Sequence, residues 1–478
     1  MPMMSLSAAA RETEAELRGP DITFDSVATD TRTLAPCALF VALKGDRFDG
    51  HQFVAQAQAA GAVAAMVEEA GLSKQDRGSS NRLSLLIVAD TRKALGRLAA
   101  YWRGRFTLPL VGLTGSSGKT TVKEMLAGIL REACAAQSSI LDSESCVLAT
   151  RGNLNNDIGV PLMLLELNPN HRFAVIEMGM NHAGEIRYLT RLAAPDVALV
   201  NNAGRAHLEF FASEEAIARA KGELYQDLKA VGTAVINADE RFAPLWRELA
   251  AGRKQIDFGI GCEATVTATY ALRYLESEIV VKMPRGEAGA TLKAPGLHNV
   301  KNALAAAAAA TALDIGPQAV TAGLARFTGM KGRLQKKPGL NGATLIDDSY
   351  NANPESVRAA IAVLAQAPGR KLLVMGDMGE LGPDAPRLHA ETGEAARVAG
   401  IDHLLTLGEL SAHAARAFGG AARHFSRIED LLAEIENLLE PGVTALVKGS
   451  RFMQMERVTK AFALEGEAID ERREEKKR

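Results

Sequence analysis

The ten residues GLTGSSGKTT, from Gly112 to Thr121, decide the fold of the central part of this chain. They follow an apolar, strand-like run from Leu108 to Val111 and precede a helical pattern from Val122 to Leu130. A strand, a glycine-rich turn and a helix N-terminus direct several backbone N–H groups and the positive end of a helix dipole at one anion. The stretch therefore predicts a phosphate-binding loop (P-loop).

The residues of this loop have separate expected tasks. Lys119 would reach the outer phosphates of a nucleotide, and the hydroxyl of Thr120 would coordinate Mg²⁺. The spacing departs from G-x-x-x-x-G-K-[ST], because Leu113 stands where the first glycine belongs. A surface turn that merely precedes Lys-Thr is the alternative, and the flanking strand and helix argue against it. The expected nucleotide-binding residues are Thr114, Gly115, Ser116, Ser117, Gly118, Lys119, Thr120 and Thr121.

Composition indicates a multidomain enzyme in the cytoplasm. The 478 residues are 47% apolar, which suffices for about three domains of ordinary size. A net charge of −2 gives no electrostatic reason to expect a nucleic acid or an anionic membrane as a partner. The N-terminus has no signal-peptide pattern, and no apolar run approaches membrane-spanning length.

The four cysteines are Cys37, Cys134, Cys146 and Cys262, and none forms a C-x-x-C pair. This spacing argues against a zinc ribbon or a disulfide framework and fits a reducing compartment.

The chain divides into stretches of different texture. Residues 1–107 mix short strand-like segments with alanine-rich helices, and residues 108–328 alternate strands with helices after the P-loop. Residues 329–465 repeat the alternation after a linker near 327–333, and residues 466–478 form a charged tail. We therefore predict an α/β protein of three domains, with a central P-loop domain built on a doubly wound, mostly parallel sheet and a Rossmann-like C-terminal domain.

Polar residues stand where the predicted central strands end, which is where such sheets gather ligands. Glu177 ends an apolar strand and would supply a carboxylate for a metal beside the nucleotide, although it could instead neighbour a helix N-cap. His207 lies in a polar loop after another strand, where a structural role is an equal alternative. Lys221 follows on a helix, where a lysine taken alone is usually solvated.

Two further clusters would complete a nucleotide site. Asn299 and Asn302 open an alanine-rich helix at positions i and i+3, so both amides can face one ligand edge. Residues 347–354, Asp-Asp-Ser-Tyr-Asn-Ala-Asn-Pro, close a buried strand with two carboxylates and several amides, which is rarely mere turn chemistry.

Together these motifs resemble the Mur ligases, the ATP-dependent, amide-forming family of peptidoglycan precursor synthesis. The resemblance covers nearly all of the chain except the tail. The P-loop, Glu177, His207, Lys221 and the G-x-H-N-x-x-N motif at 296–302 match the whole family. The segments 153–161, 202–209, 348–354, 376–382 and 448–451 match its D-alanyl-D-alanine-adding branch.

The resemblance implies a reaction and its ligands. A carboxylate of a UDP-muramyl tripeptide would attack the γ-phosphate of ATP, and the amine of D-alanyl-D-alanine would displace phosphate from the resulting acyl phosphate. The implied cofactors are ATP and Mg²⁺, and the implied form is a monomer.

Residue roles follow from the resemblance. Lys119, Glu177, His207 and Lys221 would be catalytic, with Thr120, Glu177, His207 and a carbamoylated Lys221 as metal ligands. Asn299 and Asn302 would lie near the adenine, and Arg333 and Asp348 would reach the phosphates and the ribose when the domains close. The implied residues for the two other substrates are Thr31, Arg32, Lys44, Asp49 and His51 on the uridine-nucleotide side, and Asn351, Asn353 and Arg451 on the dipeptide side.

Three alternatives stay open at this point. The tripeptide-forming ligase of the family should carry a D-N-P-R-type motif where this chain has D-S-Y-N-A-N-P. Folylpolyglutamate synthetase shares the two-domain core but not the N-terminal domain. A P-loop protein that hydrolyses ATP without ligation is the alternative from another class.

Overall fold

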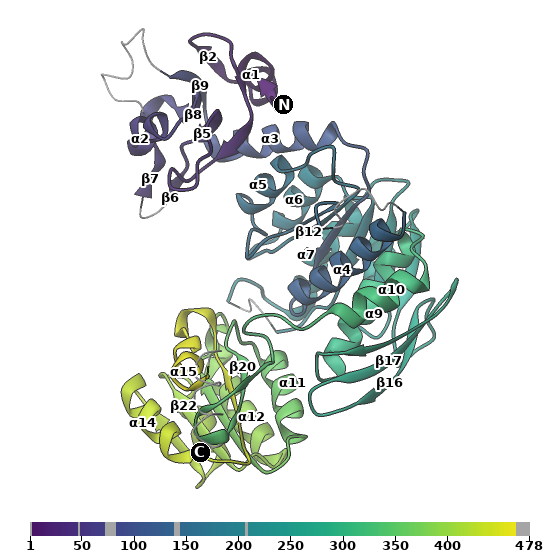
Figure 1. Ribbon diagram of the computed structural model, residues 1–478, viewed down its shortest axis with the longest axis vertical. Coiled ribbons are helices and arrows are strands. Elements are labelled where there is room, and N and C mark those ends of the chain that lie inside the picture. Colours follow the sequence, from purple (N-terminus) through teal and green to yellow (C-terminus); the bar gives the residue numbers. More distant parts are fainter. Residues whose placement is uncertain (1, 46–47, 72–82, 138–143, 206–208, 465–478) are drawn as a thin grey trace, which may run out of the picture.

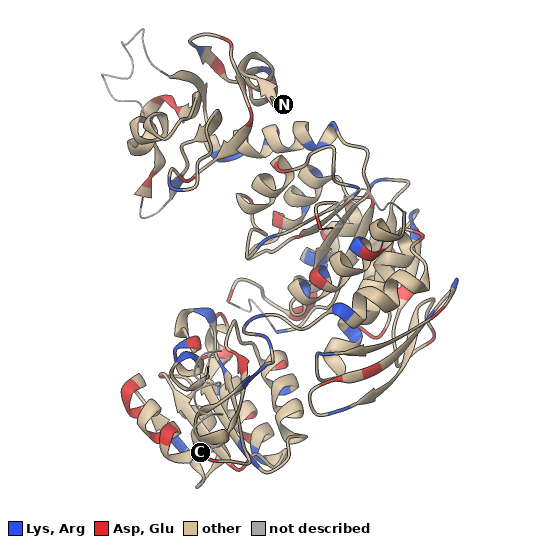
Figure 2. Cartoon of the chain, in the orientation of Figure 1, with Lys and Arg blue, Asp and Glu red and all other residues tan. Residues whose placement is uncertain are grey.

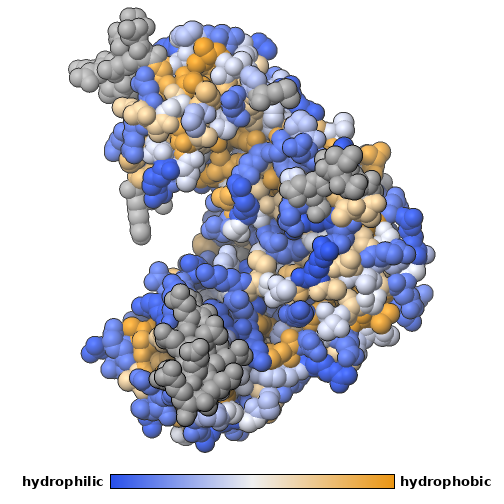
Figure 3. Space-filling view, in the orientation of Figure 1, coloured by the Kyte–Doolittle hydropathy of each residue, from blue (hydrophilic) through white to orange (hydrophobic). Residues whose placement is uncertain are grey.

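A computed structural model of the chain describes residues 2–45, 48–71, 83–137, 144–205 and 209–464. The chain forms three lobes in sequence order, with the central lobe between the other two (Figure 1). The first and third lobes face each other across a broad hollow that Figure 3 shows on the same side of the molecule. Lysines, arginines and acidic residues are interspersed over all three lobes (Figure 2).

The first lobe is built on a five-stranded sheet of order β2-β9-β8-β5-β4, in which β2 is antiparallel to β9 and the other pairs are parallel. Its strands are short, and those at the centre of the sheet are apolar and buried. The elements are β1 (Met4–Ser5), α1 (Leu6–Thr13), β2 (Glu16–Arg18), β3 (Thr23–Phe24), β4 (Ser26–Ala28), β5 (Ala38–Val41), β6 (Lys44–Gly45), β7 (Phe48–Asp49), α2 (Val54–Ala59), β8 (Ala64–Glu68), β9 (Ser84–Val88) and α3 (Thr91–Gly104).

The central lobe contains a six-stranded, wholly parallel sheet of order β11-β12-β10-β13-β14-β15. The strands β12, β10, β13 and β14 are largely apolar and buried, as parallel strands covered by helices require, whereas the edge strand β15 begins with exposed polar residues. The elements are β10 (Leu110–Thr114), α4 (Lys119–Gln137), β11 (Val147–Ala149), α5 (Gly159–Leu165), β12 (Phe173–Glu177), α6 (Glu185–Ala193), β13 (Val197–Val200), α7 (Glu214–Gln226), β14 (Thr233–Asn237), α8 (Ala243–Leu249) and β15 (Lys254–Phe258).

The chain order across this sheet reverses at β10. The strands β11 and β12 lie on one side of it, and β13 lies on the other. Ligands of doubly wound sheets bind outside the carboxyl ends of the strands at such a switch point. The P-loop follows β10 and is therefore placed at the expected binding edge.

A three-stranded antiparallel sheet and two helices complete this lobe. They are β16 (Thr267–Leu272), β17 (Ser277–Met283), β18 (Gly286–Leu292), α9 (Leu297–Ala312) and α10 (Pro317–Arg326). The alanines from Ala303 to Ala310 in α9 are fully buried with Leu304, because side chains of this size let α9 pack closely against α4 and the sheets.

The third lobe is a second doubly wound unit of order β19-β20-β24-β21-β22-β23, parallel except for β19. The fold class expected from the sequence is thus confirmed. The elements are β19 (Gln335–Pro338), β20 (Thr344–Asp348), α11 (Pro354–Ala365), β21 (Arg370–Gly376), α12 (Ala385–Val398), β22 (His403–Leu407), α13 (Ala412–Phe418), β23 (Ala422–Phe425), α14 (Ile428–Leu438), β24 (Val443–Lys448) and α15 (Glu456–Phe462). The predicted charged tail lies outside the described residues.

Helix α3 fastens the first lobe to the central one. It packs against α5 and α6, and the indole Nε1 of Trp102 donates to the carbonyl of Leu167 at 2.9 Å. The guanidinium of Arg103, nearly buried, donates to the carbonyl of Ala193 at 3.0 Å. Through these contacts α3 links the first lobe to the central lobe.

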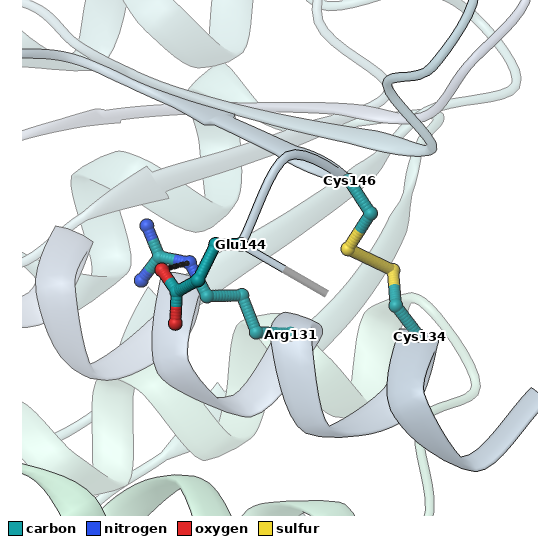
Figure 4. Close-up of a disulfide and its surroundings, with 4 residues drawn as sticks. All are labelled: Arg131, Cys134, Glu144 and Cys146. Carbon is teal, nitrogen blue, oxygen red and sulfur yellow. Dashed lines mark ion pairs between the residues drawn. A yellow bond between two sulfur atoms is a disulfide. The ribbon is translucent and has the colours of Figure 1, made fainter. Parts of the chain in front are cut away.

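The cysteine expectation was wrong for one pair. Cys134, near the end of α4, and Cys146, just before β11, form a disulfide (Figure 4). An ion pair of 3.1 Å between Arg131 and Glu144 links the same two segments. The two cysteines are 12 residues apart, and the spacing rule failed because the sheet brings the end of α4 beside the start of β11. Cys37 and Cys262 are free.

Candidate active site

The P-loop is fixed by hydrogen bonds to the segment that follows β13. The backbone N–H of Ser117 donates to Asn202 Oδ1 at 2.8 Å, and that of Ser116 donates to the carbonyl of Asn202 at 3.1 Å. Gly118 has φ +79°, and a Cβ there would lie 2.3 Å from Asn302 Oδ1. The loop therefore needs glycine at this position for both its backbone conformation and its packing.

Lys119 begins α4 and folds back over the loop. Its Nζ donates to the carbonyl of Gly115 at 2.7 Å. Burial lowers the pKa of Lys119, the carboxylate of Glu177 opposes that shift, and the positive charge of Arg333 adds to it. A lysine held this way presents its charge to the space above the loop.

Thr120 and Glu177 form an oxygen-rich cluster beside Lys119. The hydroxyl of Thr120 donates to Glu177 Oε2 at 2.9 Å, and Asn155 Nδ2 donates to Glu177 Oε1 at 2.8 Å. Glu177 is 2% exposed, and its backbone N–H donates to the hydroxyl of Thr150 at 2.9 Å. The carboxylate is thus held in one orientation at the end of β12.

Lys221 lies on α7, is 1% exposed and borders the same cavity as Lys119. Burial lowers its pKa well below the ordinary value, and the charge of Lys119 lowers it further. Among the described residues nothing forms an ion pair or hydrogen bond with its amine. The reading of Lys221 as a solvated helix-surface lysine is therefore excluded. His207 lies outside the described residues.

Asn299 and Asn302 belong to a chain of amides that ends at the P-loop. Asn302 Nδ2 donates to Asn299 Oδ1 at 3.2 Å, and Asn201 Nδ2 donates to Asn302 Oδ1 at 3.0 Å. Asn201 Nδ2 also donates to the carbonyl of Ser117 at 3.0 Å. The chain ties the start of α9 to the loop.

The third lobe contributes directly to the P-loop. Arg333 Nη2 donates to the hydroxyl of Thr120 at 3.1 Å, and Asn353 Nδ2 donates to the hydroxyl of Ser117 at 3.1 Å. Both contacts join residues more than 200 positions apart. The central and third lobes are therefore in direct contact at the P-loop, and we call this arrangement closed.

A cavity of about 1350 Å³ lies between these elements. It is large enough for a nucleotide together with part of a second substrate. Of the residues expected at the site, those that line it are Ser116, Ser117, Gly118, Lys119, Thr120, Thr121, Glu177, Lys221, Asn299, Asn302, Arg333, Asp348, Asn351, Asn353 and Arg451. Thr114 ends β10 and Gly115 begins the loop, and neither lines the cavity.

Asp348 forms a buried ion pair with Lys448. Lys448 Nζ donates to its Oδ2 at 2.7 Å, and the backbone N–H of Leu334 donates to its Oδ1 at 3.1 Å. Burial raises the pKa of Asp348, and the ammonium of Lys448 opposes that shift. Asp348 thereby anchors the chain next to Arg333.

Tyr350 lies between two arginines. The guanidinium carbon of Arg333 is 4.4 Å from the centre of its ring, and that of Arg451 is 5.9 Å away. Arg451 also forms an ion pair of 3.0 Å with Glu456.

The five residues expected on the uridine-nucleotide side do not line this cavity. Arg32 is exposed and paired with Asp30 at 2.6 Å, and Thr31 precedes it in the same loop. Lys44 is exposed and begins β6, where it pairs with Asp49 of β7. Asp49 and His51 pair at 2.6 Å, and the His51 ring accepts from the backbone N–H of Glu68 at 2.9 Å. Asp49 and His51 therefore have a structural task in the first lobe.

Several cavity residues were missed as site candidates. Asn155 orients Glu177, Lys448 pairs with Asp348, and Arg92 at the start of α3 reaches the cavity from the first lobe. Lys448 could have been found, because it ends a parallel strand directly before a Gly-Ser turn. Asn155 lies in the segment 153–161 that resembles the D-alanyl-D-alanine-adding branch, whereas Arg92 carries no local signal.

The comparisons with known families cover most of the chain. Residues 23–103 match the Mur ligase family catalytic domain, residues 113–310 match the Mur ligase middle domain, and residues 332–451 match the Mur ligase glutamate ligase domain.

Individual relatives extend over nearly the whole length. The chain is 43% identical to the UDP-N-acetylmuramoyl-tripeptide–D-alanyl-D-alanine ligase of Escherichia coli, covering 94% of this chain and 96% of that one. The enzyme of the same name from Bacillus subtilis is 35% identical, with 91% and 92% covered.

Two solved structures are similar to this chain in fold as well as in sequence. A crystal structure of MurF from Acinetobacter baumannii superposes with a TM-score of 0.87 at 37% identity and covers 96% of this chain and 99% of that one. MurF ligase from Thermotoga maritima in complex with ADP gives a TM-score of 0.77 at 27% identity and covers 91% of this chain and 96% of that one. With three matching domains and relatives of this identity over its whole length, the chain belongs to the Mur ligase family.

Proposed function

We propose that this chain is the ATP-dependent ligase that joins D-alanyl-D-alanine to a UDP-N-acetylmuramoyl-tripeptide. The observation that carries the proposal is one cavity bordered by the P-loop, the Thr120–Glu177 cluster and the arginine and asparagine of the third lobe. The relatives that bear this activity in their names match the chain almost from end to end. The product is the UDP-muramyl-pentapeptide used in peptidoglycan synthesis.

The reaction has two displacement steps. An oxygen of the tripeptide carboxylate attacks the γ-phosphorus of ATP, and the bond to the β-phosphate oxygen breaks to release ADP. The amine nitrogen of D-alanyl-D-alanine, after losing a proton, attacks the carbonyl carbon of the acyl phosphate, and inorganic phosphate leaves.

The protein's task is to align and neutralise anions, since little covalent chemistry falls to it. Lys119 and Arg333 bring two positive charges to the P-loop, one from each lobe. The P-loop N–H groups and the N-terminus of α4 add partial positive charge. These groups would stabilise the charge that develops on the transferred phosphoryl group.

The donor set fits Mg²⁺ as the metal. The described residues contain no cluster of three or more His, Cys, Asp or Glu side chains, so an all-protein cage is absent from that part of the chain. Thr120 and Glu177 offer the hard oxygen donors that Mg²⁺ prefers, with phosphate oxygens and water to complete the shell. When bound, the ion would neutralise phosphate charge and orient the γ-phosphate.

Lys221 fits this scheme as a carbamate. Burial lowers the pKa of the Lys221 amine and so favours its neutral form, and the neutral amine is the form that adds CO₂. The carbamate is an anionic oxygen donor, whereas an ammonium would repel the metal. By resemblance to the family, His207 and the Lys221 carbamate would hold a second Mg²⁺.

The remaining roles follow the position of each residue around the cavity. Asn299 and Asn302 border the side where the adenine would lie, and Arg333 and Asp348 the side of the phosphates and ribose. Asn351, Asn353 and Arg451 line the third-lobe wall, where the dipeptide would enter. The first lobe would bind the uridine nucleotide through Thr31, Arg32 and Lys44, and through the loop that the pair of Asp49 and His51 shapes.

Product analysis tests this function. The purified chain is incubated with ATP, Mg²⁺, a UDP-muramyl-tripeptide and a panel of amines, and the products are identified by mass spectrometry. A product carrying the added dipeptide is expected with D-alanyl-D-alanine and not with single amino acids. A product formed instead from a UDP-muramyl-dipeptide and a diamino acid would assign the chain to the tripeptide-forming enzymes.

A further inference from the structure

Arg205 lies one residue beyond a backbone contact of the P-loop. The N–H of Gly204 donates to the hydroxyl of Ser116 at 3.0 Å, which fixes the segment after β13 against the loop. Arg205 extends from this segment toward the third lobe, and its side chain is 19% exposed. The positively charged guanidinium of Arg205 therefore belongs to the central lobe and lies at its interface with the third lobe.

Two carboxylates of the third lobe meet this guanidinium. Arg205 Nε is 2.7 Å from Glu355 Oε1, and Arg205 Nη1 is 3.4 Å from Glu391 Oε2. Glu355 is in the first turn of α11, whereas Glu391 is on α12. One planar guanidinium therefore bridges two helices, and it can do so only while both are correctly placed.

The third lobe positions Glu391 before Arg205 reaches it. Arg358 on α11 holds Glu391 Oε2 at 2.9 Å, and Arg387 on α12 pairs with Glu391 Oε1. Glu355 is only two residues from Asn353, whose amide contacts Ser117 of the P-loop. The ion pair between Arg205 and Glu355 is thus next to the hydrogen bond that brings α11 onto the nucleotide loop.

We propose that Arg205, Glu355 and Glu391 form a latch that holds the central and third lobes closed, and that Arg205 is a positioning residue for ligation. The latch rests on the ligase function proposed above. It acts through Arg333 and Asn353, whose hydrogen bonds with Thr120 and Ser117 join the third lobe to the P-loop in this arrangement. It touches neither the reacting phosphate nor the metal-binding oxygens.

The latch predicts a specific pattern of defects. Without Arg205 the closed state loses its cross-lobe ion pairs, so a smaller fraction of molecules brings Arg333 to Thr120. Partly exposed ion pairs are weakened by salt, so the wild-type advantage should shrink as ionic strength rises. Removing Arg205 should leave the fold of the central and third lobes unaffected, because the ion pairs lie outside their hydrophobic cores.

The test combines kinetics with solution scattering on Arg205→Ala, Glu355→Gln and the double variant. Each single change should lower kcat/KM for ATP in ligation by about tenfold, and the double variant should be no worse than Arg205→Ala, because that change already removes the ion pair with Glu355. With an ATP analogue and the UDP substrate, the wild type should become more compact in scattering, and the variants should stay more extended. Arg205→Lys, which keeps the charge but loses the fork, should be intermediate.

Arg423→Ala is the matched control. Arg423 is exposed and pairs with Glu434 at 2.6 Å within the third lobe, so its removal should change neither compaction nor kcat/KM. Losses that multiply in the double variant, or variants that compact like the wild type, would overturn the latch. If the wild type compacts but forms no pentapeptide, the proposed ligase function fails while the latch stands.

Discussion

Lys221 offers the sharpest test of the metal site, because its surroundings predict both an activity and a stability effect. We consider Lys221→Met, which keeps the volume of a side chain that is 1% exposed, and Lys221→Ala, which opens a space in the wall of the cavity that Lys119 also lines. Loss of one anionic ligand in the site should lower the ligation rate by ~10²–10³-fold in both variants.

The pH dependence has a definite sign. The pKa of Lys221 is lowered by burial and by Lys119, so the folded chain holds a neutral amine at pH values where the unfolded chain holds an ammonium. The unfolded state then binds one more proton, and the stability of the wild type rises with pH until the ordinary lysine pKa near ~10.4 is reached. One proton corresponds to a slope of about 1.4 kcal/mol per pH unit, which Lys221→Met should remove.

Two measurements check these effects. Denaturant unfolding in CO₂-free buffer between pH 7 and 9 should show a difference in slope between the wild type and Lys221→Met. Phosphate release by Lys221→Ala should be partly restored by formate or acetate, which can occupy the vacated space, whereas Lys221→Arg should gain nothing. Most of the activity remaining in Lys221→Ala in bicarbonate-free buffer, together with equal slopes, would refute the reasoning.

Three further changes give simple outcomes. Lys119→Ala should lower ligation by ~10³-fold with an unchanged melting temperature, because its contact is with the loop carbonyl of Gly115 and not with the core; wild-type turnover in phosphate release would contradict it. Gly118→Ala should weaken ADP binding in calorimetry by tenfold or more, since φ +79° and a Cβ 2.3 Å from Asn302 Oδ1 cost roughly 1–3 kcal/mol; unchanged affinity would show that the loop tolerates a side chain. Lys448→Met should lower the free energy of unfolding by about 3–5 kcal/mol at pH 8, because it leaves Asp348 buried without its cation, and Lys448→Arg should lose less.

The fold was predictable where a short stretch of sequence defines a strand or a turn by itself. Apolar runs such as Phe173–Glu177 and Thr233–Asn237 are long enough to define buried strands, and the observed bounds agree with them. The P-loop could be placed for the same reason, since strand, turn and helix are contiguous in sequence.

The cross-lobe chemistry was only partly predictable. Ser117 and Asn353 are 236 residues apart, and no local pattern states that one amide reaches the other hydroxyl. Asp348 was expected at a ribose, yet the parallel register of β20 and β24 places Lys448 beside it and forms an ion pair. The disulfide between Cys134 and Cys146 depends likewise on which helix end the sheet edge approaches.

The first lobe shows a different limit. His51 was expected to contact the uridine nucleotide, and its ring pairs with Asp49 and accepts a hydrogen bond from the backbone N–H of Glu68. A sequence motif cannot separate a residue that shapes a loop from one that contacts the ligand of that loop.

Phosphate release with systematic omission of substrates tests the central claim most directly. With ATP, Mg²⁺ and a UDP-muramyl-tripeptide, adding D-alanyl-D-alanine should switch on sustained release, with one phosphate for each pentapeptide formed. ATP alone should give no sustained release. Equal rates of phosphate release with and without the dipeptide would contradict the account and identify the chain as an ATPase that does not ligate.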